Sequence, residues 1–307
     1  MPATDYEVQA PYALVTVRLA SDPAERLGLL SGEGSLRVID DAPQLGLFAA
    51  IQHWDSLEAR LRRDGDAGRE INEPFTLLAP LRFPRKVICV AANHIDHLRE
   101  IGADLTQVTP AWTPFFFLKP PTTTVIAPGD PVAIPHHIPD PRLDWEGEVG
   151  LVIGRQVKEA TPEEAKAAVA GFTVVNDLSA RGAMRREVAP AEAVRFDWLS
   201  TKGFDGAFPI GPGLVPHWLV PDPGTLRITS TVDGQTMQDS TTELLVADMY
   251  QLASTLSQFM TLEPGDVIAT GTPGGVGNAR GIFLSPGSTV SVQVAGIGRI
   301  TNRIVDA

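Results

Sequence analysis

Two glutamates separated by one residue open an apolar run near the middle of the chain. Glu146 and Glu148 adjoin the mostly apolar residues 149–153, so this segment is predicted to be a strand that carries both carboxylates on one face. Like charges this close are costly unless a cation lies between them. Asp177 follows a second predicted strand at 172–176 and could supply a third carboxylate. Three oxygen ligands favour Mg²⁺ or Mn²⁺, with Ca²⁺ less favoured and Zn²⁺ disfavoured.

Each of these carboxylates also has a simpler interpretation. A Glu-x-Glu pair is common on a solvated sheet face, and an aspartate after a strand is often a helix N-cap or a turn residue. If all three bind one ion, the two strands cannot be parallel neighbours, because Glu146 and Glu148 enter their strand whereas Asp177 leaves its own. The sequence therefore predicts strands that are antiparallel or lie in different sheets, and it disfavours a doubly wound parallel fold.

A histidine and a glutamate lie three residues apart in a predicted helix that begins with Asn93 as its N-cap and Asp96 at the third helical position. His97 and Glu100 would share one face of this helix and could act on one water molecule. The imidazole would serve as a general base, and the carboxylate would fix its tautomer. The alternative is an exposed helical pair without a catalytic role.

Two cations complete the set of candidates. Lys202 precedes Gly203 in a turn-like stretch and could stabilise a developing oxyanion, and Arg181 could bind a carboxylate through two parallel hydrogen bonds. Either could equally be a surface cation. The glycine-rich segment 271–277 lacks the Gly-Lys-Ser/Thr ending of a P-loop and the spacing of a dinucleotide fingerprint, so nucleotide binding is disfavoured.

Composition and charge restrict the class of protein. Apolar residues make up 43% of the 307 residues and charged residues 20%, as is usual for soluble globular proteins. A formal net charge of -12 argues against nucleic acid or an anionic membrane as a partner. The chain has no run of 18 apolar residues and no signal-like N-terminus, so we expect a cytoplasmic protein. The single cysteine, Cys89, lies in an apolar run and is expected to be a buried packing thiol.

The order of elements predicts two unequal domains. Strands at 13–19 and 36–39 and a helix over 47–61 make a small N-terminal α/β domain at 1–78. The remainder, 79–307, is rich in predicted strands and turns, including a hairpin at Asp233-Gly234 and another at 290–305. Helices are predicted from Thr161 to a stop at Gly171 and over 247–260. The fold class is therefore α+β and mostly β.

Six segments together resemble the fumarylacetoacetate hydrolase (FAH) family, in the family's order. They are residues 86–97, 117–120, 144–154, 176–181, 202–205 and 265–277. The resemblance implies a catalytic domain built as a mixed β-roll or sandwich, and a homodimer. It also implies a Mg²⁺ or Mn²⁺ ion held by three carboxylates, a water-activating pair on a lid helix, a lysine that offsets the developing anion, and a pocket lined by an arginine and a Gly-Thr pair. These residues are Glu146, Glu148 and Asp177; His97 and Glu100; Lys202; and Arg181, Gly271 and Thr272.

Some residues depart from the family pattern. The family often has Tyr where this chain has His94, and Asp and Gln near the positions of Gly182 and Met184, which leaves the substrate open. We expect a metal-dependent hydrolase that cleaves a carbon–carbon bond in a small anionic 2-oxo acid. This would be an acylpyruvate or β-diketo acid resembling fumarylpyruvate or fumarylacetoacetate, as in aromatic catabolism. A decarboxylase, hydratase or isomerase acting through the same enolate is the alternative, and a non-catalytic ligand-binding protein is a second one.

Overall fold

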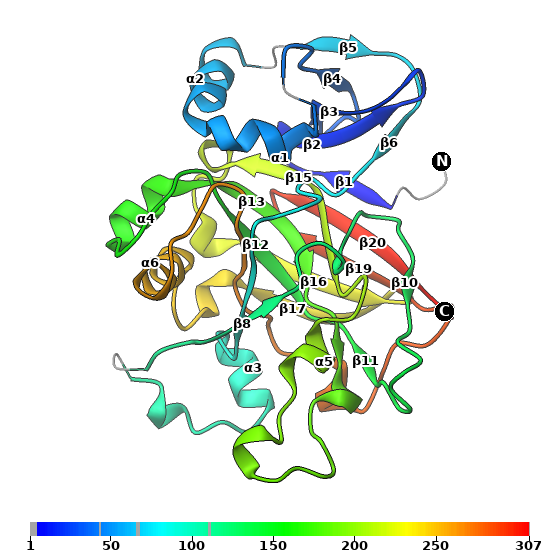
Figure 1. The fold of residues 1–307 in the computed structure, drawn as a ribbon, viewed down its shortest axis with the longest axis vertical. Helices are drawn as coiled ribbons and strands as arrows, with labels where there is room; N and C mark the ends of the chain where they lie inside the picture. Colours follow the sequence, from blue (N-terminus) through cyan, green and yellow to red (C-terminus); the bar gives the residue numbers. More distant parts are fainter. Residues whose placement is uncertain (1–4, 43, 66–67, 110–111, 307) are drawn as a thin grey trace.

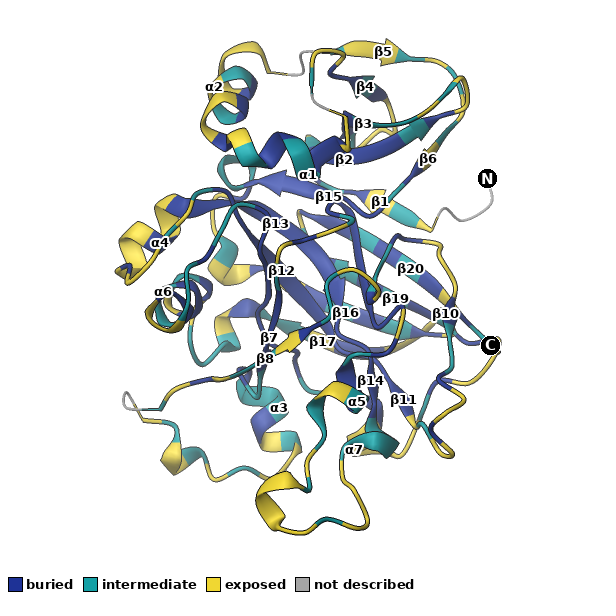
Figure 2. Ribbon diagram, in the orientation of Figure 1, coloured by how far each residue is buried: buried dark blue, intermediate teal, exposed yellow. Residues whose placement is uncertain are grey.

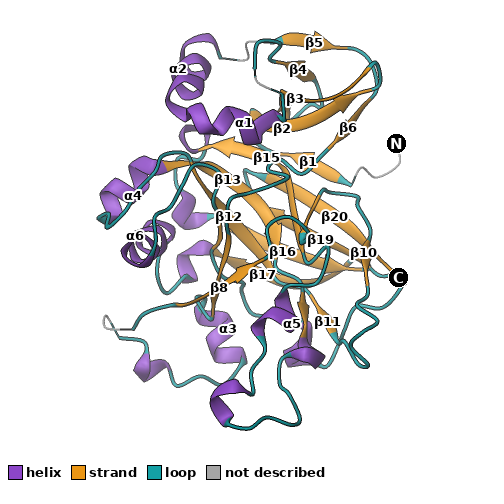
Figure 3. Ribbon diagram, in the orientation of Figure 1, coloured by secondary structure: helices purple, strands orange, loops and turns teal. Residues whose placement is uncertain are grey.

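The computed structural model describes residues 5–42, 44–65, 68–109 and 112–306. The fold is mostly β, with a few short helices at its periphery (Figures 1 and 3). Twelve described strands form the larger sheet, in the path β5-β4-β3-β2-β15-β13-β12-β18-β7-β8, with β6 beside β2 and β9 beside β15. Their bounds in that order are Arg69–Ile71, Leu36–Val38, Asp22–Ser31, Tyr12–Leu19, Phe208–Pro216, Val169–Asn176, Gly147–Ile153, Val267–Ala269, Val87–Ala91 and Phe115–Lys119, then Phe75–Leu77 for β6 and Val125–Ile126 for β9.

A second sheet packs against the central strands of the first. Its path is β1-β20-β19-β16-β17, with β10 beside β20, and a separate two-stranded ribbon joins β11 to β14. The bounds are Tyr6–Val8, Gly298–Val305, Thr289–Val294, Arg227–Val232, Gln235–Thr241 and Val132–Ala133 for the sheet, and Leu143–Asp144 and Ser179–Ala180 for the ribbon. Val149 of β12, Phe172 of β13 and Val292 of β19 share one core cluster, so the main core lies between the sheets (Figure 2).

The described helices flank the sheets. They are α1 (Gly46–Ala50), α2 (Trp54–Asp64), α3 (Ile95–Glu100), α4 (Pro162–Ala168), α5 (Trp198–Lys202), α6 (Met249–Phe259) and α7 (Gly277–Arg280). In Figure 1, α1 and α2 cover the N-terminal strands, whereas α3 and α5 lie at the opposite end of the molecule. The described part of the chain includes no helix that is both long enough and apolar enough to cross a membrane.

The pairing of β12 with β13 confirms the strand geometry that the carboxylates predicted. The two strands are antiparallel, with Gly147 opposite Asn176 and Glu148 opposite Val175. This register brings the start of β12 beside the end of β13, so residues that enter one strand adjoin residues that leave the other. β18 also pairs antiparallel with β12. The central strands are therefore not those of a doubly wound parallel sheet.

The helix starts were predicted with mixed success. Thr161 caps α4 in a complete capping box with Glu164, as the sequence indicates. This helix ends at Ala168 rather than Gly171, because β13 already begins at Val169. The predicted N-cap at Asn93 is wrong: His94 caps α3 by accepting a hydrogen bond from Asp96 N (3.3 Å). The Asn93 amide donates instead to the carbonyls of Ala247 and Thr270 (3.0 and 2.8 Å).

The N-terminal strands continue the larger sheet. Leu14 of β2 pairs with Leu214 of β15, and β6 pairs with β2. The strand β3 was missed by the sequence analysis, because residues 22–31 include a proline and three charged residues and do not alternate cleanly. A boundary between domains at residues 78 and 79 remains a prediction.

Candidate active site

The three carboxylates predicted as metal ligands lie together and are buried. One oxygen from each of Glu146, Glu148 and Asp177 lies within 4.8 Å of the others. Backbone hydrogen bonds fix this arrangement: Asp177 N donates to Glu146 O (2.8 Å), and Gly271 N donates to Glu148 Oε2 (2.6 Å). A cluster of hard oxygen donors at this spacing fits a Mg²⁺- or Mn²⁺-type ion.

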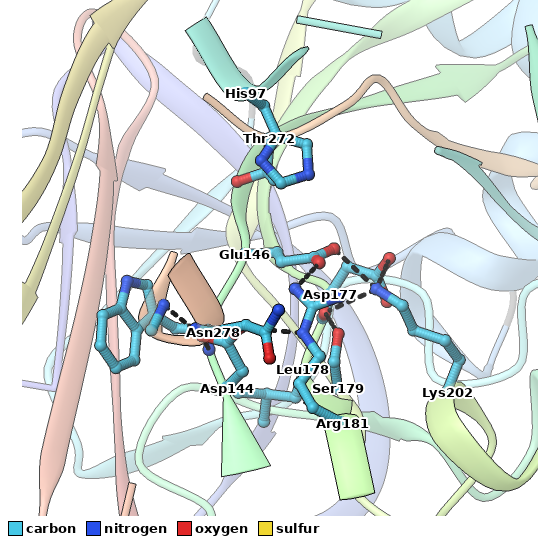
Figure 4. Close-up of polar contacts among 12 residues, drawn as sticks. His97, Asp144, Glu146, Asp177, Leu178, Ser179, Arg181, Lys202, Thr272 and Asn278 are labelled. Carbon is cyan, nitrogen blue, oxygen red and sulfur yellow. Dashed lines mark hydrogen bonds and ion pairs between the residues drawn. The ribbon is translucent and has the colours of Figure 1, made fainter. Parts of the chain in front are cut away.

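Two buried lysines offset the charge of the triad (Figure 4 shows Lys202). Lys202 Nζ, at the end of α5, lies 2.6 Å from Glu146 Oε2 and 2.8 Å from Asp177 Oδ2. Lys119 Nζ, at the end of β8, contacts Asp177 Oδ1 and donates to the carbonyls of Leu178 and Ala207 (3.0 and 2.7 Å). Without such cations, ionising three buried carboxylates together would be strongly unfavourable.

The pKa values in the cluster follow these contacts. Burial would lower the pKa of Lys202, but Asp177 and Glu146 raise it above its ordinary value. Burial would raise the pKa of Glu146, and the charges of Lys202 and Arg181 lower it instead. The pKa of Glu148 lies well above its usual range, because burial and the neighbouring carboxylates of Asp177 and Glu146 all disfavour its ionised form. The cluster thus divides into carboxylates with and without a cationic partner.

Arg181 is held by two carboxylates from the end of β11 and the residues just after it. Its Nε donates to Asp144 Oδ2 (2.8 Å), and its Nη2 contacts Glu146 Oε1. Asp144 is itself fully buried and accepts hydrogen bonds from the backbone of Gly277 (2.6 Å) and Asn278 (3.1 Å). One buried carboxylate therefore links the arginine, the start of α7 and the segment between β11 and β12 that carries Glu146.

His97 and Glu100 lie on the face of α3 that borders the same cavity. His97 Nδ1 is 3.3 Å from Glu100 Oε2, and Gly275 N donates to Glu100 Oε1 (2.8 Å). Their side chains are 13% and 18% exposed, so this is a partly enclosed pair rather than an exposed one. Burial would raise the pKa of Glu100, but hydrogen bonds from His97 and from the Gly275 backbone lower it. In Figure 4 the imidazole lies above Glu146.

The cavity has a volume of about 440 Å³. Its lining comes from the end of β7, α3, β8, the segment just before β12, the segment that follows β14, α5, the loop after β18 and α7. The lining residues are Val90, Ala91, Ala92, His97, Glu100, Ile101, Phe117, Glu146, Arg181, Met184, Trp198, Lys202, Thr272, Val276, Asn278 and Ala279. Thr272 is at this wall, but its hydroxyl donates to Gly147 O (3.1 Å) and accepts from Gln238 Nε2 (2.7 Å). The Gly271 N–H is taken by Glu148.

Three residues that the sequence analysis did not select support the cluster. Lys119 and Asp144 lie inside the motifs that carry the family resemblance, so their place in those motifs was the available signal. Gln238 is fully buried on β17, and its amide binds Gly147 N (3.0 Å), Thr272 Oγ1 and Pro273 O (2.8 Å). Its sequence context, an alternating hairpin strand, carries no sign of this role.

The family model for the C-terminal domain of fumarylacetoacetate hydrolase matches residues 86–305. This range includes the triad, α3 and both lysines, and the chain belongs to the FAH family. Its fold is the FAH fold, which confirms the fold class that the sequence predicts.

The relatives and structural neighbours are named for different activities. Human mitochondrial oxaloacetate tautomerase FAHD2B is 38% identical over 232 residues, which are 75% of this chain and 69% of the relative. A solved 5-carboxymethyl-2-hydroxymuconate delta-isomerase from Mycobacterium smegmatis is 31% identical, with a TM-score of 0.73 over 96% of this chain and 99% of its own. Maleylpyruvate hydrolase from Sphingobium sp. SYK-6, solved with manganese(II) and pyruvate, is 25% identical, with a TM-score of 0.73 over 96% and 99% of the two chains.

Proposed function

We propose that this protein is a divalent-metal-dependent hydrolase that cleaves a carbon–carbon bond in an acylpyruvate. The observation that carries the proposal is the hydrogen-bonded pair of His97 and Glu100 on one wall of a cavity that also contains Glu146 of the carboxylate triad. A tautomerase or a decarboxylase needs an enolate-stabilising centre but no activated water, whereas hydrolysis and hydration both need one. The maleylpyruvate hydrolase neighbour, with its manganese and pyruvate, supports the same substrate type.

The residues that would hold the ion are Glu146, Glu148 and Asp177, because their oxygens already converge. Bound there, Mg²⁺ or Mn²⁺ would supply Lewis acidity that polarises the carbonyls of a 2-oxo acid. Arg181 and Lys202 would meet the anionic end of the substrate, since both lie beside Glu146 at the cavity wall. Thr272 would border the same end.

His97 would activate the water. With Nδ1 protonated and facing Glu100, Nε2 is the nitrogen free to accept a proton from water. The resulting hydroxide bonds to the carbon of the distal carbonyl, and Lys202 offsets charge that develops in the reacting chain. The bond from that carbon to the neighbouring CH₂ then breaks and leaves its electron pair on the three-carbon fragment. His97 returns the proton to this fragment, which gives pyruvate and a carboxylic acid.

The proposal is tested with a panel of acylpyruvates, oxaloacetate and 2-hydroxydienoates in the presence of Mg²⁺ or Mn²⁺. Loss of the enol absorbance is followed, and the products are identified by NMR. We expect His97→Ala and Glu100→Ala to reduce acylpyruvate cleavage at least about a hundredfold, with the Mn²⁺-induced rise in melting temperature retained. Arg99→Ala, an exposed change on the same helix, is the control. Acylpyruvate cleavage by His97→Ala at the wild-type rate would contradict this mechanism.

A second candidate is keto–enol tautomerisation of oxaloacetate, favoured by the name of the human relative. It uses the same polarised 2-oxo acid but no attacking water, so carbon–carbon cleavage would be absent and the enol and keto forms would simply exchange. Decarboxylation differs again by release of carbon dioxide. Product analysis in the same panel separates the three reactions.

The oligomeric state and location are also proposals. A homodimer is expected from the family resemblance and is checked by light scattering after size-exclusion chromatography. The cytoplasmic location expected from the sequence is checked by fractionation of the source cells.

A further inference from the structure

Two of the cations that line the active-site cavity lie at the end of it where Glu146 of the carboxylate triad is found. Arg181 and Lys202 both contact Glu146, one to each carboxylate oxygen. His97, the remaining basic residue of the lining, is paired with Glu100. An anionic group of the substrate would therefore find its positive partners in this one region.

The wall next to this region is aromatic. The rings of Phe117 and Trp198 stack with centroids 5.1 Å apart and planes 23° apart. Lys202 Nζ lies 5.2 Å from the Phe117 ring centroid, so the aromatic wall begins directly beside the charged end. Trp198 and Lys202 are four residues apart on α5 and share a face of that helix.

Met184 extends the apolar wall. Its carbonyl accepts a hydrogen bond from Asp197 N (2.9 Å), which fixes its backbone beside the start of α5. The two arginines that follow Met184 are engaged elsewhere, since Arg185 pairs with Glu192 (3.0 Å) and Arg186 contacts Asp197. Ile101, at the end of α3, lines the cavity as well.

We infer that the substrate's distal substituent, beyond the 2-oxo acid, is uncharged and apolar, and that Met184 and Trp198 select it. The inference rests on the proposed function, since it takes the triad as the site that binds the 2-oxo acid. It departs from the substrate expected from the family resemblance, because fumarylpyruvate and fumarylacetoacetate both carry a distal carboxylate. A second carboxylate placed against Met184 and Trp198, beyond the Phe117 ring that adjoins Lys202, would lose hydration and gain no cation from the cavity lining, which is unfavourable unless the carboxylate stays in water. A methylene chain or an aryl ring would instead gain from burial there.

Binding of two non-cleavable ligands to the Mn²⁺-loaded protein tests this inference without relying on hydrolysis. 2-Oxohexanoate and 2-oxoadipate have the same carbon count, and differ by a terminal methyl in place of a terminal carboxylate. By titration calorimetry we expect 2-oxohexanoate to bind at least about tenfold more tightly. Met184→Lys is expected to reduce or invert this preference, whereas Met184→Leu, which keeps an apolar side chain of similar size, is expected to preserve it.

The outcomes are separable from those of the proposed function. Equal or tighter binding of 2-oxoadipate to the wild type would overturn the inference, even if acylpyruvates are cleaved. A preference for 2-oxohexanoate would support it, even if no acylpyruvate is cleaved. Failure of both ligands to bind would overturn it together with the assignment of the cavity. The same comparison in turnover uses butanoylpyruvate and succinylpyruvate, where a preference for succinylpyruvate would again contradict it.

Discussion

Glu148 is the triad member without a lysine within hydrogen-bonding distance among the described contacts; its Oε2 accepts from Gly271 N (2.6 Å). Glu148→Gln preserves the size of the side chain and an acceptor for that N–H, and its neutral amide resembles the protonated carboxyl that the raised pKa of Glu148 favours. We expect the metal-free variant to be at least as stable as the wild type, because the amide never has to ionise beside the two other buried carboxylates.

The same variant should lose the response to metal. Mn²⁺ at a hundred times its Kd stabilises a one-site protein by about 2.7 kcal/mol. We expect a matching rise in melting temperature for the wild type and for Glu33→Gln, an exposed control, and little or none for Glu148→Gln. A scanning fluorimetry titration measures both quantities. An undiminished Mn²⁺ response in Glu148→Gln would remove Glu148 from the metal site.

We expect Asp144 to act through Arg181 rather than on the substrate. It is fully buried, and Arg181 Nε, Gly277 N and Asn278 N converge on its two oxygens. Asp144→Asn would turn one acceptor into a donor that faces other donors, so Arg181 should lose its fixed position. We expect kcat/KM to fall by roughly 10- to 100-fold, with Asp140→Asn on the exposed loop before it unaffected. Unchanged kcat/KM in Asp144→Asn would contradict this positioning role.

Among the elements, the strand β12 shows what the sequence could predict and what it could not. The chain order of Glu146, Glu148 and Asp177 already required antiparallel or separate strands, and the β12–β13 register meets that requirement. The position of Lys202 at the end of a short helix was not predictable, because α5 has only one turn and a weak periodic pattern. The contact of Gln238 with Gly147 and Thr272 joins residues more than thirty positions apart, and local patterns do not encode such contacts.

Gly147 separates the two glutamates because the second sheet lies too close for a side chain. A Cβ at this position would overlap Ser230 Oγ of β16 and lie 2.8 Å from Val292 Cγ1 of β19. We expect Gly147→Ala to destabilise the protein by roughly 1–3 kcal/mol through overpacking. Urea unfolding measures this loss. Gly224→Ala, where the nearest atom is the Asp222 carboxylate at 3.2 Å, should change stability far less. Equal effects of the two substitutions would argue against close sheet packing as the cause.

At the scale of the whole molecule, the N-terminal strands and helices are joined to the part of the chain that matches the family model by more than the shared sheet. Trp54 of α2 packs on Trp218, with ring centroids 6.0 Å apart, and the Arg62 guanidinium lies 4.4 Å from the centroid of the Trp218 ring. Glu58 of α2 accepts from Arg155 Nη2 (2.6 Å), just beyond β12, and lies 3.3 Å from His217 Nε2. These contacts link α2 to the residues that follow the central strands β12 and β15.

The ion-pair network of Glu58 makes this docking sensitive to acid. Burial alone would raise the pKa of Glu58 from its ordinary value of 4.5, but hydrogen bonds from Arg155, Arg62 and His217 lower it to about 2. Because the folded-state pKa is the lower one, the contribution of Glu58 to stability is present above about pH 4.5 and is lost as the pH falls toward 2.

We expect Glu58→Gln to lower the melting temperature by roughly 2 °C at pH 7, with the difference from wild type shrinking steadily between pH 4.5 and pH 3. Thermal unfolding followed by circular dichroism at several pH values measures it, with Glu33→Gln as the matched control. A difference that stays constant down to pH 3 would show that Glu58 stabilises the interface through packing rather than charge.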